Sequence, residues 1–203
     1  MNLKEQIIEY RKESGSLSGL STKTDLYFLE KYGVNSPKKD GYNYDGVLVP
    51  GNIYFFTYET DSRISEKVKF INRNPLILYI SSEKIGDDIV VKSIDLSITP
   101  PDKRIDILQS FSDKFSSTLD RNQKETSKGG RPEEIRLSSK ELPSLFAGSG
   151  YNYSFTGFKF RFFKDIKFVD YSDWNKIPFL KYTSIQGMSV NEIYTDYRSK
   201  LKG

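Results

Sequence analysis

Three pairs of acidic residues are the groups in this sequence that could do acid-base or metal chemistry. They are Asp87 with Asp88, Glu133 with Glu134, and Asp170 with Asp173. Paired carboxylates hold Mg²⁺ or transfer protons only where further ligands or partners converge on them. Each pair lies in a predicted turn or loop, where solvated acidic residues are ordinary, and no convergent group can be placed beside it. The pairs therefore predict no catalytic or metal site.

The sequence contains neither cysteine nor histidine. This excludes disulfides, thiol nucleophiles, His-dependent triads and the usual ligands of zinc, iron and copper. An enzyme would have to work with carboxylates, lysine or tyrosine alone. The sequence also lacks a P-loop, a GxGxxG motif and a GxSxG motif. We therefore expect a protein that is not an enzyme and that needs no cofactor and no metal.

A second kind of chemistry is suggested by residues 151–171, YNYSFTGFKFRFFKDIKFVDY. Aromatic and basic residues together are typical of surfaces that bind single-stranded nucleic acid, where exposed rings stack on bases beside cations that follow the backbone. Here Tyr151, Tyr153 and Phe155 occupy odd positions, and the apolar residues Phe158, Phe160, Phe162, Ile166 and Phe168 occupy even positions. A change of parity reverses the buried face of a strand, so we expect two strands with a bulge or tight turn at Thr156 and Gly157.

In the second of these strands the rings point to one side and the charges to the other. This separation counts against a stacking platform and predicts buried rings with a basic outer face. The residues that could contact phosphates or an acidic partner are Lys159, Arg161, Lys164 and Lys167. The net charge of the chain, +4, permits such a contact without requiring it.

The elements that must position these residues begin with a three-stranded meander. Residues 47–59, 75–81 and 88–98 are rich in strand formers and are separated by turn residues. Thr99, two prolines and Asp102 then form a helix start, with Thr99 as the expected N-cap. The helix is predicted over 102–119, and its apolar stripe should pack on the sheet. The members of that stripe are Ile105, Leu108, Phe111, Phe115 and Leu119.

The N-terminal region, residues 1–46, is predicted to be a helical arm followed by a loop. Leu3, Ile7 and Tyr10 share one face of a helix over residues 2–12. This helix either lies on its own domain or acts as an assembly arm that reaches a neighbouring subunit. A second short helix is expected over 24–32, capped by Thr22 and Asp25, and residues 35–46 have the composition of a loop.

Residues 47–203 are predicted to form the core domain, with a polar insertion at about 118–140. A polar stretch of this length is either disordered or a loop that becomes ordered against a partner. Towards the C-terminus, a capping box at Ser189 and Glu192 precedes a helical stripe that ends near Leu201.

The fold class that follows is α+β: a small bent antiparallel β-sheet or partly open β-barrel, with packed helices and an N-terminal helical arm. With 14 Tyr, 14 Phe and one Trp, the core should be built around aromatic rings. No apolar run reaches the length of a signal peptide or of a membrane span, so we expect a protein that does not contact a membrane.

Several motifs of the chain resemble those of a family of small tailed-bacteriophage virion and packaging proteins. PGNIYFFTY at 50–58 is similar to the family's PGxxYxFxY, and NPLI at 74–77 is similar to its Pro-Leu strand. Asp95 and Leu96, followed by Pro100, Pro101 and Arg104, resemble its NLxxxPPxxR element. Trp174, the IPF at 177–179 and the predicted terminal helix also follow in the family's order.

The resemblance implies a phage structural protein at the portal, neck or tail junction, such as a head-tail connector or ring protein. Its expected partners are copies of itself in a ring-like homo-oligomer and other virion proteins, such as portal or tail components. It would be located in the virion after assembly in the host cytoplasm. The alternative is a DNA-end-binding or genome-packaging protein, whose basic strand face would contact DNA.

Overall fold

The computed structural model describes residues 3–13, 16–33, 48–59, 72–137, 140–148 and 155–181. The helices are α1 (Leu3–Lys12), α2 (Leu17–Tyr32), α4 (Pro101–Ser127) and the single turn α5 (Leu142–Leu145). The strands are β1 (Ile53–Tyr58), β2 (Leu76–Ile85), β3 (Asp88–Asp95), β4 (Phe155–Lys159) and β5 (Phe163–Phe168). Short 3₁₀ turns are η2 (Phe160–Phe162), η3 (Tyr171–Asp173) and η4 (Ile177–Phe179). The predicted α+β fold is confirmed.

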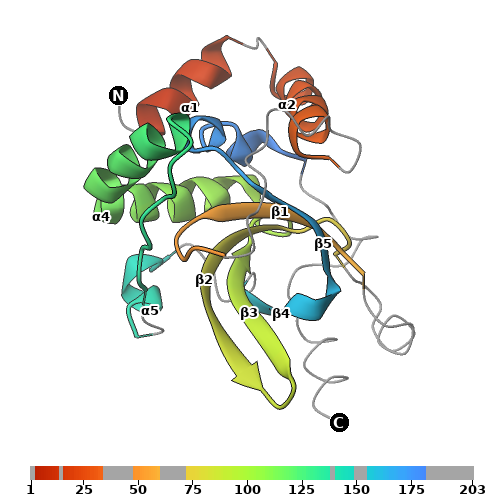
Figure 1. The fold of residues 1–203 in the computed structure, drawn as a ribbon. Helices are drawn as coiled ribbons and strands as arrows, with labels where there is room; N and C mark the ends of the chain where they lie inside the picture. The colour runs from red at the N-terminus through yellow and green to blue at the C-terminus, as the bar shows by residue number, and fades with distance from the viewer. Residues whose placement is uncertain are drawn as a thin grey trace.

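Helices and sheet occupy opposite ends of the molecule (Figure 1). Helices α1, α2 and α4 lie together at one end, over the strongly bent sheet. The hairpin formed by β2 and β3 points away from all three helices. The loop predicted at 35–46 and the helix predicted near the C-terminus lie outside the described residues.

The five strands form one antiparallel sheet in the order β4-β3-β2-β1-β5. Strands β4 and β5 stand at the two ends of this order, yet the three residues of η2 join them directly. The sheet must therefore bend until its edges approach each other. At the approach, the Tyr58 hydroxyl accepts a hydrogen bond from the Lys159 backbone N–H at 3.2 Å. The result is the expected bent sheet, which is not closed.

The break in the aromatic stretch differs from the predicted one. Thr156 and Gly157 lie inside β4, where Gly157 pairs with Lys92 of β3, and the chain turns instead at η2. A bulge in β5 explains why the sequence parity was misleading. Between Phe55 and Thr57 of β1 the register skips one residue of β5, next to Asp165, whose φ is +50°.

This bulge lets two rings an odd number of residues apart point into the same core. Phe163 and Phe168 are both buried, while Phe162 is only partly buried. Phe163 stacks on Phe56 of β1, with ring centroids 3.9 Å apart. Without the extra residue, the alternation of β5 would turn one of these two rings outward.

The region predicted as a polar insertion is mostly ordered on the protein. Helix α4 continues to Ser127, beyond the predicted end at 119, after a kink at Phe115. The Asn122 side chain then holds the backbone of Glu133, donating to its C=O at 2.9 Å and accepting from its N–H at 2.7 Å. The Ile135 N–H donates to the Pro50 carbonyl at 2.9 Å, and the Ile135 side chain is buried.

Both predicted helix starts are corrected by the structure. Helix α2 begins at Leu17 instead of 24, because Ser16 caps it by accepting a hydrogen bond from the Gly19 N–H. Helix α4 begins after Pro100 without a side-chain cap. The Thr99 hydroxyl, expected to cap it, donates instead to the Asp95 carbonyl at 2.7 Å.

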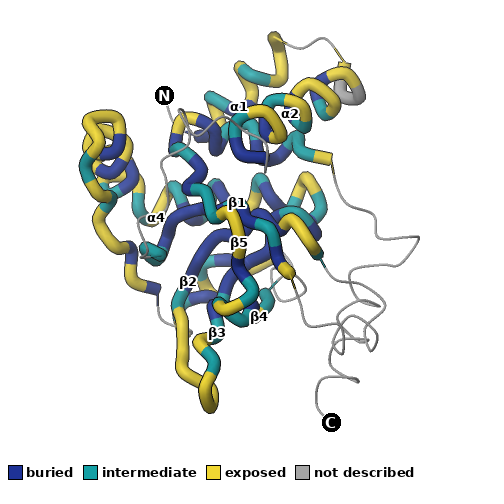
Figure 2. Tube along the Cα trace, turned by 45° about the vertical axis from the view of Figure 1, so that its right-hand side comes forward, coloured by how far each residue is buried: buried dark blue, intermediate teal, exposed yellow. Residues whose placement is uncertain are grey.

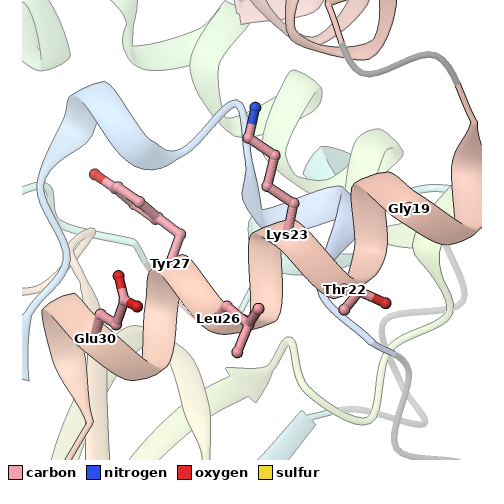
Figure 3. Close-up of a pocket in the computed structure, with 6 residues that line it drawn as sticks. All are labelled: Gly19, Thr22, Lys23, Leu26, Tyr27 and Glu30. Atoms are coloured by element: carbon pink, nitrogen blue, oxygen red, sulfur yellow. The ribbon is translucent and has the colours of Figure 1, made fainter.

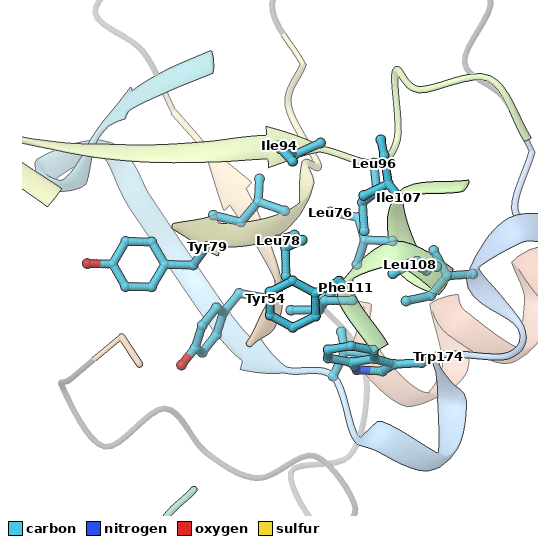
Figure 4. Close-up of a cluster of buried hydrophobic side chains, with 14 of the residues drawn as sticks. Tyr54, Leu76, Leu78, Tyr79, Ile94, Leu96, Ile107, Leu108, Phe111 and Trp174 are labelled. Carbon is cyan, nitrogen blue, oxygen red and sulfur yellow. The ribbon is translucent and has the colours of Figure 1, made fainter. Parts of the chain in front are cut away.

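Part of the core lies between α4 and the face of the sheet that carries Leu78 and Ile94, opposite to the face with Phe56 and Phe158 (Figure 4). From the strands and the β3–α4 connection it contains Leu76, Leu78, Ile94 and Leu96, and from α4 it contains Ile107, Leu108 and Phe111. Trp174, after η3, packs on Phe111 with ring centroids 6.1 Å apart. Leu108 and Phe111 of the predicted stripe are thus buried in this core, together with Ile107, which the prediction omitted, whereas Ile105 and Phe115 are only partly buried. The ring of Trp174 joins the later 3₁₀ turns to α4.

Arg104 is fully buried on the first turn of α4. Its guanidinium donates to four backbone carbonyls: Thr99 at 2.8 Å, Leu180 at 2.5 Å, Ser97 at 3.2 Å and Ile177 at 3.3 Å. Two of these carbonyls precede α4 and two belong to the segment around η4. One side chain therefore fixes two distant parts of the chain against each other.

Gly51 gives a direct test of how the sheet meets the segment after α4. Its φ is +88°, and a Cβ at this position would lie 2.5 Å from the Ile135 Cβ. We expect Gly51→Ala to lower the free energy of unfolding by about 2 to 4 kcal/mol, from the clash and the positive φ together. Urea denaturation measures the change.

Gly86→Ala is the matched control. Gly86 also has a positive φ, +60°, but nothing lies within 4 Å of the added Cβ. This variant should lose only the conformational part, about 1 kcal/mol. Equal losses in the two variants would show that residues 130–137 do not pack on Gly51.

Candidate interaction surfaces

The three acidic pairs of the sequence do not converge on a common site. Their members are distributed as follows: Asp87 lies in the β2–β3 turn, Asp88 pairs with Lys159 and Arg161, Glu133 pairs with Arg121, Glu134 pairs with Arg136, and Asp170 caps η3. Within the described ranges, no group of three His, Cys, Asp or Glu residues could hold a metal ion.

Asp173 is the one member of these pairs that is buried. Its carboxylate accepts hydrogen bonds from four side chains: Tyr32 at 2.6 Å, Lys176 at 2.7 Å, Lys31 at 2.8 Å and Tyr27 at 2.9 Å. Burial by itself raises the pKa of Asp173, but the hydrogen bonds from Lys176, Lys31 and Tyr32 outweigh it and hold that pKa below its usual value. Three of the donors belong to α2, so this cluster attaches α2 to η3.

The basic residues predicted on the second strand are largely neutralised within the protein. Lys159 and Arg161 both pair with Asp88, at 2.8 Å and 3.0 Å. The hydrogen bond from Lys159 is the main reason why the pKa of Asp88 is lowered. Lys167 is partly buried and donates to the Gly33 carbonyl at the end of α2, at 2.7 Å. Of the four candidate contacts, Lys164 is exposed on β5 and forms no ion pair with another described residue.

The predicted assembly arm lies on its own domain. Leu3 and Ile7 are buried in the core of the same chain. Tyr10 packs on Phe179 with ring centroids 5.7 Å apart, and its hydroxyl lies 3.2 Å from the Thr24 hydroxyl. In the single chain, the stripe formed by these three residues of α1 is therefore occupied by its own domain. The role of these residues as an assembly arm stays a prediction.

In the described part of the chain, the large hydrophobic side chains that are exposed occur in two places. Ile8, Leu26 and Leu29 lie on α1 and α2, and Ile85 and Ile89 flank the turn between β2 and β3. Each of the five is between 44% and 60% exposed. Figures 1 and 2 place α1 and α2 at one end of the molecule and the hairpin turn at the other. Exposed apolar groups are thus concentrated at two opposite ends.

The first place includes a shallow groove of about 750 Å³ along α2 (Figure 3). The described residues that line it are Gly19, Thr22, Lys23, Leu26, Tyr27 and Glu30. Their spacing of three and four residues puts them on one face of the helix. Gly19 and Glu30 stand at the two ends of this face, and Leu26 lies between Lys23 and Glu30. We call these residues, together with the adjacent Leu29, the α2 face.

The second place is the hairpin tip, residues 84–89. Ile85 pairs with Asp88 and Lys84 with Ile89, which leaves Gly86 and Asp87 as a two-residue turn. Gly86 has a φ of +60°, as a glycine in the first position of a II′ turn does. Figure 2 shows the tip as an exposed projection beyond the buried body of the sheet. The Asp88 ion pairs with Lys159 and Arg161 link the base of this tip to β4 and η2.

A smaller hollow of about 310 Å³ lies beside the kink of α4. Its described lining residues are Leu3, Gln6, Ser112, Asp113, Ser116, Leu119, Asp120, Gln123, Tyr171 and Trp174. The Asp113 carboxylate already accepts a hydrogen bond from the Gln109 amide at 2.5 Å, and none of these described lining residues is basic.

No described helix is long and apolar enough to span a bilayer.

The sequence reasoning missed both exposed apolar surfaces, although signals for each were present. A Gly-Asp dipeptide between two alternating runs is typical of a two-residue hairpin turn. Within residues 19–30, the residues of the α2 face recur at intervals of three and four, as one face of a helix does. The helix was predicted to begin at 24, so the part of this face before residue 24 was not recognised.

No protein-family model matches this chain, and no curated protein or solved structure matches it either. The similarity to tailed-phage virion proteins remains a prediction that depends on the quoted motifs.

Replacing Asp173 tests the attachment of α2. In Asp173→Asn the two lysines lose their buried counter-charge, so we expect the free energy of unfolding to fall by about 3 kcal/mol at neutral pH. The folded-state pKa of Asp173 lies below its unfolded value of about 3.9. Its stabilising effect is therefore complete above that value and is lost as the pH falls through the folded-state pKa.

Chemical denaturation from neutral to acid pH measures this effect. The difference in unfolding free energy between the native chain and Asp173→Asn should shrink on acidification. Asp87→Asn, which removes an exposed carboxylate, should show almost no difference at any pH. A difference for Asp173→Asn that stays constant down to the most acid condition would contradict the role of its charge.

Asp88 and Asp87 form a matched pair for testing the neutralised basic face. Asn at either position removes one negative charge, but only Asp88→Asn releases Lys159 and Arg161. We expect Asp88→Asn to elute from a heparin column at higher salt than Asp87→Asn, because two more cations become available to the polyanion. Equal elution of the two variants would mean that the ion pairs do not restrain the basic side chains.

Proposed function

We propose that this chain is a non-enzymatic structural protein that acts by packing against copies of itself and against other virion proteins. The observation that carries the proposal is that, among the described residues, the exposed large hydrophobic side chains lie at two opposite ends, the α2 face with Ile8 and the hairpin tip. Clustered exposed apolar groups are characteristic of protein–protein contact surfaces, whereas single scattered ones are not.

The placement of these groups also favours one kind of assembly. Two different surfaces at opposite ends of a subunit make head-to-tail contacts, which close into rings when the rotation between subunits allows it. A two-fold dimer would use the same surface on both partners and would leave the other end exposed. The arrangement therefore supports a ring-like homo-oligomer.

The phage setting comes from the sequence resemblance. Its motif residues include Gly51, Arg104 and Trp174, all of which hold the fold together. A similar set of fold-determining residues in the same order supports a similar fold and, with it, a place at the portal, neck or tail junction. On this proposal the protein is assembled in the host cytoplasm and remains in the virion as a connector or ring protein.

A DNA-end-binding or packaging role is the alternative proposal. It is supported by Lys164, which is exposed, and by the net charge of +4. It is weakened by the pairing of Lys159 and Arg161 with Asp88. The two roles differ in salt dependence, because phosphate contacts weaken steeply as salt rises whereas apolar packing does not.

Light scattering after size-exclusion chromatography, combined with mass spectrometry of purified virions, tests the structural role. We expect an oligomer whose mass is unchanged from low to high salt, and the chain itself in virions of the phage that encodes it. Leu26→Ser with Leu29→Ser should reduce the oligomer, while Lys164→Ser should not. A monomer that is absent from virions and binds duplex ends only at low salt would favour the DNA role instead.

A further inference from the structure

We propose that the hairpin tip of one copy docks on the α2 face of the next copy. This inference rests on the proposed function and adds the contact by which the subunits are joined. The two surfaces lie at opposite ends of one molecule, so each is available to a different neighbour. Each surface also carries exposed apolar side chains. On the tip, Ile89 shares one face of the hairpin with Lys84, whereas Ile85 points to the opposite face, so Ile89 is the side chain that would meet Leu26 and Leu29 of α2.

The charges flanking these apolar centres are complementary. The α2 face has Lys23 one turn before Leu26 and Glu30 one turn after it, and the tip has Lys84 on a strand and Asp87 in the turn. All four are exposed, and none forms an ion pair within the described part of the chain. Docking with Asp87 at Lys23 and Lys84 at Glu30 places opposite charges together at both ends of the contact.

The order of the side chains on the two surfaces is compatible with this orientation. Lys23 and Glu30 are seven residues apart on a helix, a rise of about 10 Å, and Leu26 lies between them. Lys84 and Asp87 are closer together than three extended residues would be, because the chain turns at Gly86 and Asp87. Ile89 lies beside Lys84 on the same face of the hairpin.

The tip is held in place for such a contact from its base. Asp88 pairs with Lys159 and Arg161, and Lys92 pairs with Glu83 at 2.7 Å. These pairs join β2 and β3 to each other and β3 to β4 and η2. A hairpin restrained in this way loses less conformational entropy when it docks than a free loop would.

Disulfide trapping tests the contact, because the natural chain has no cysteine and an introduced one is the only thiol. Ile89→Cys and Leu26→Cys are prepared as separate chains, one with a mass tag, and are mixed under mild oxidation. A disulfide forms only where the Cα atoms come within about 7 Å. We expect a covalent pair of one tagged and one untagged chain, and no covalent pair from either variant alone.

Two controls accompany this experiment. Lys164→Cys replaces Ile89→Cys as an exposed thiol on β5, and it should give no product with Leu26→Cys. Charge reversal provides the second control: Lys23→Glu should weaken self-association roughly two- to five-fold, and Asp87→Lys in the same chain should restore it. Restoration by the second change is specific to a direct pairing of these two residues.

Several outcomes would overturn the inference. A disulfide between two Leu26→Cys chains would mean that α2 meets α2 across a two-fold axis. Trapping that occurs only after removal of residues 182–203 would mean that the chain's own C-terminal segment covers the groove. A salt-resistant oligomer without any hairpin-to-α2 product refutes this contact but leaves the proposed function standing. A monomer at every concentration, absent from virions, refutes the proposed function itself.

Discussion

The buried guanidinium of Arg104 is the interaction on which the arrangement of this fold depends. It donates to carbonyls of the β3–α4 connection and of the segment around η4, and the guanidinium itself is fully buried. Leaving buried carbonyls unpaired costs far more than a single hydrogen bond contributes. The four hydrogen bonds of Arg104 therefore fix the direction in which α4 leaves the sheet. Through α4 and η4 they also determine where α1 and α2 lie relative to the hairpin.

Sequence reasoning was reliable where a pattern is local. The meander and the apolar stripe of α4 follow from alternation and from three- and four-residue spacing, and both are present. It was unreliable where a distant residue decides the outcome. The extra residue of β5 beside Asp165 restores the burial of Phe163, and only its pairing with β1 reveals it. Likewise, Asn122 and Thr126 are buried in the part of α4 that looked too polar to pack.

The same limit applies to the candidate sites. Lys159 and Arg161 looked like a free basic face because Asp88 is distant in sequence, and the pairing of β3 with β4 brings the three together. The stripe of α1 looked equally suited to a neighbour and to its own domain, and burial decides for the latter. Most of the described residues that carry the family-like motifs are buried or partly buried and help to specify the fold, although Asn74 and Pro101 are exposed. Residues that would specify a partner lie on α2 and at the hairpin tip, where no motif was quoted.

Buried polar side chains such as Arg104 thus hold the interior together, and exposed apolar side chains lie on the α2 face and at the hairpin tip. We propose that these two surfaces join neighbouring subunits. Electron cryo-microscopy of the purified oligomer tests this claim most directly. The account predicts a ring in which density for residues 84–89 of each copy lies across residues 19–30 of the next. A ring or dimer in which the hairpin tips point into solvent and α2 meets another surface would contradict it.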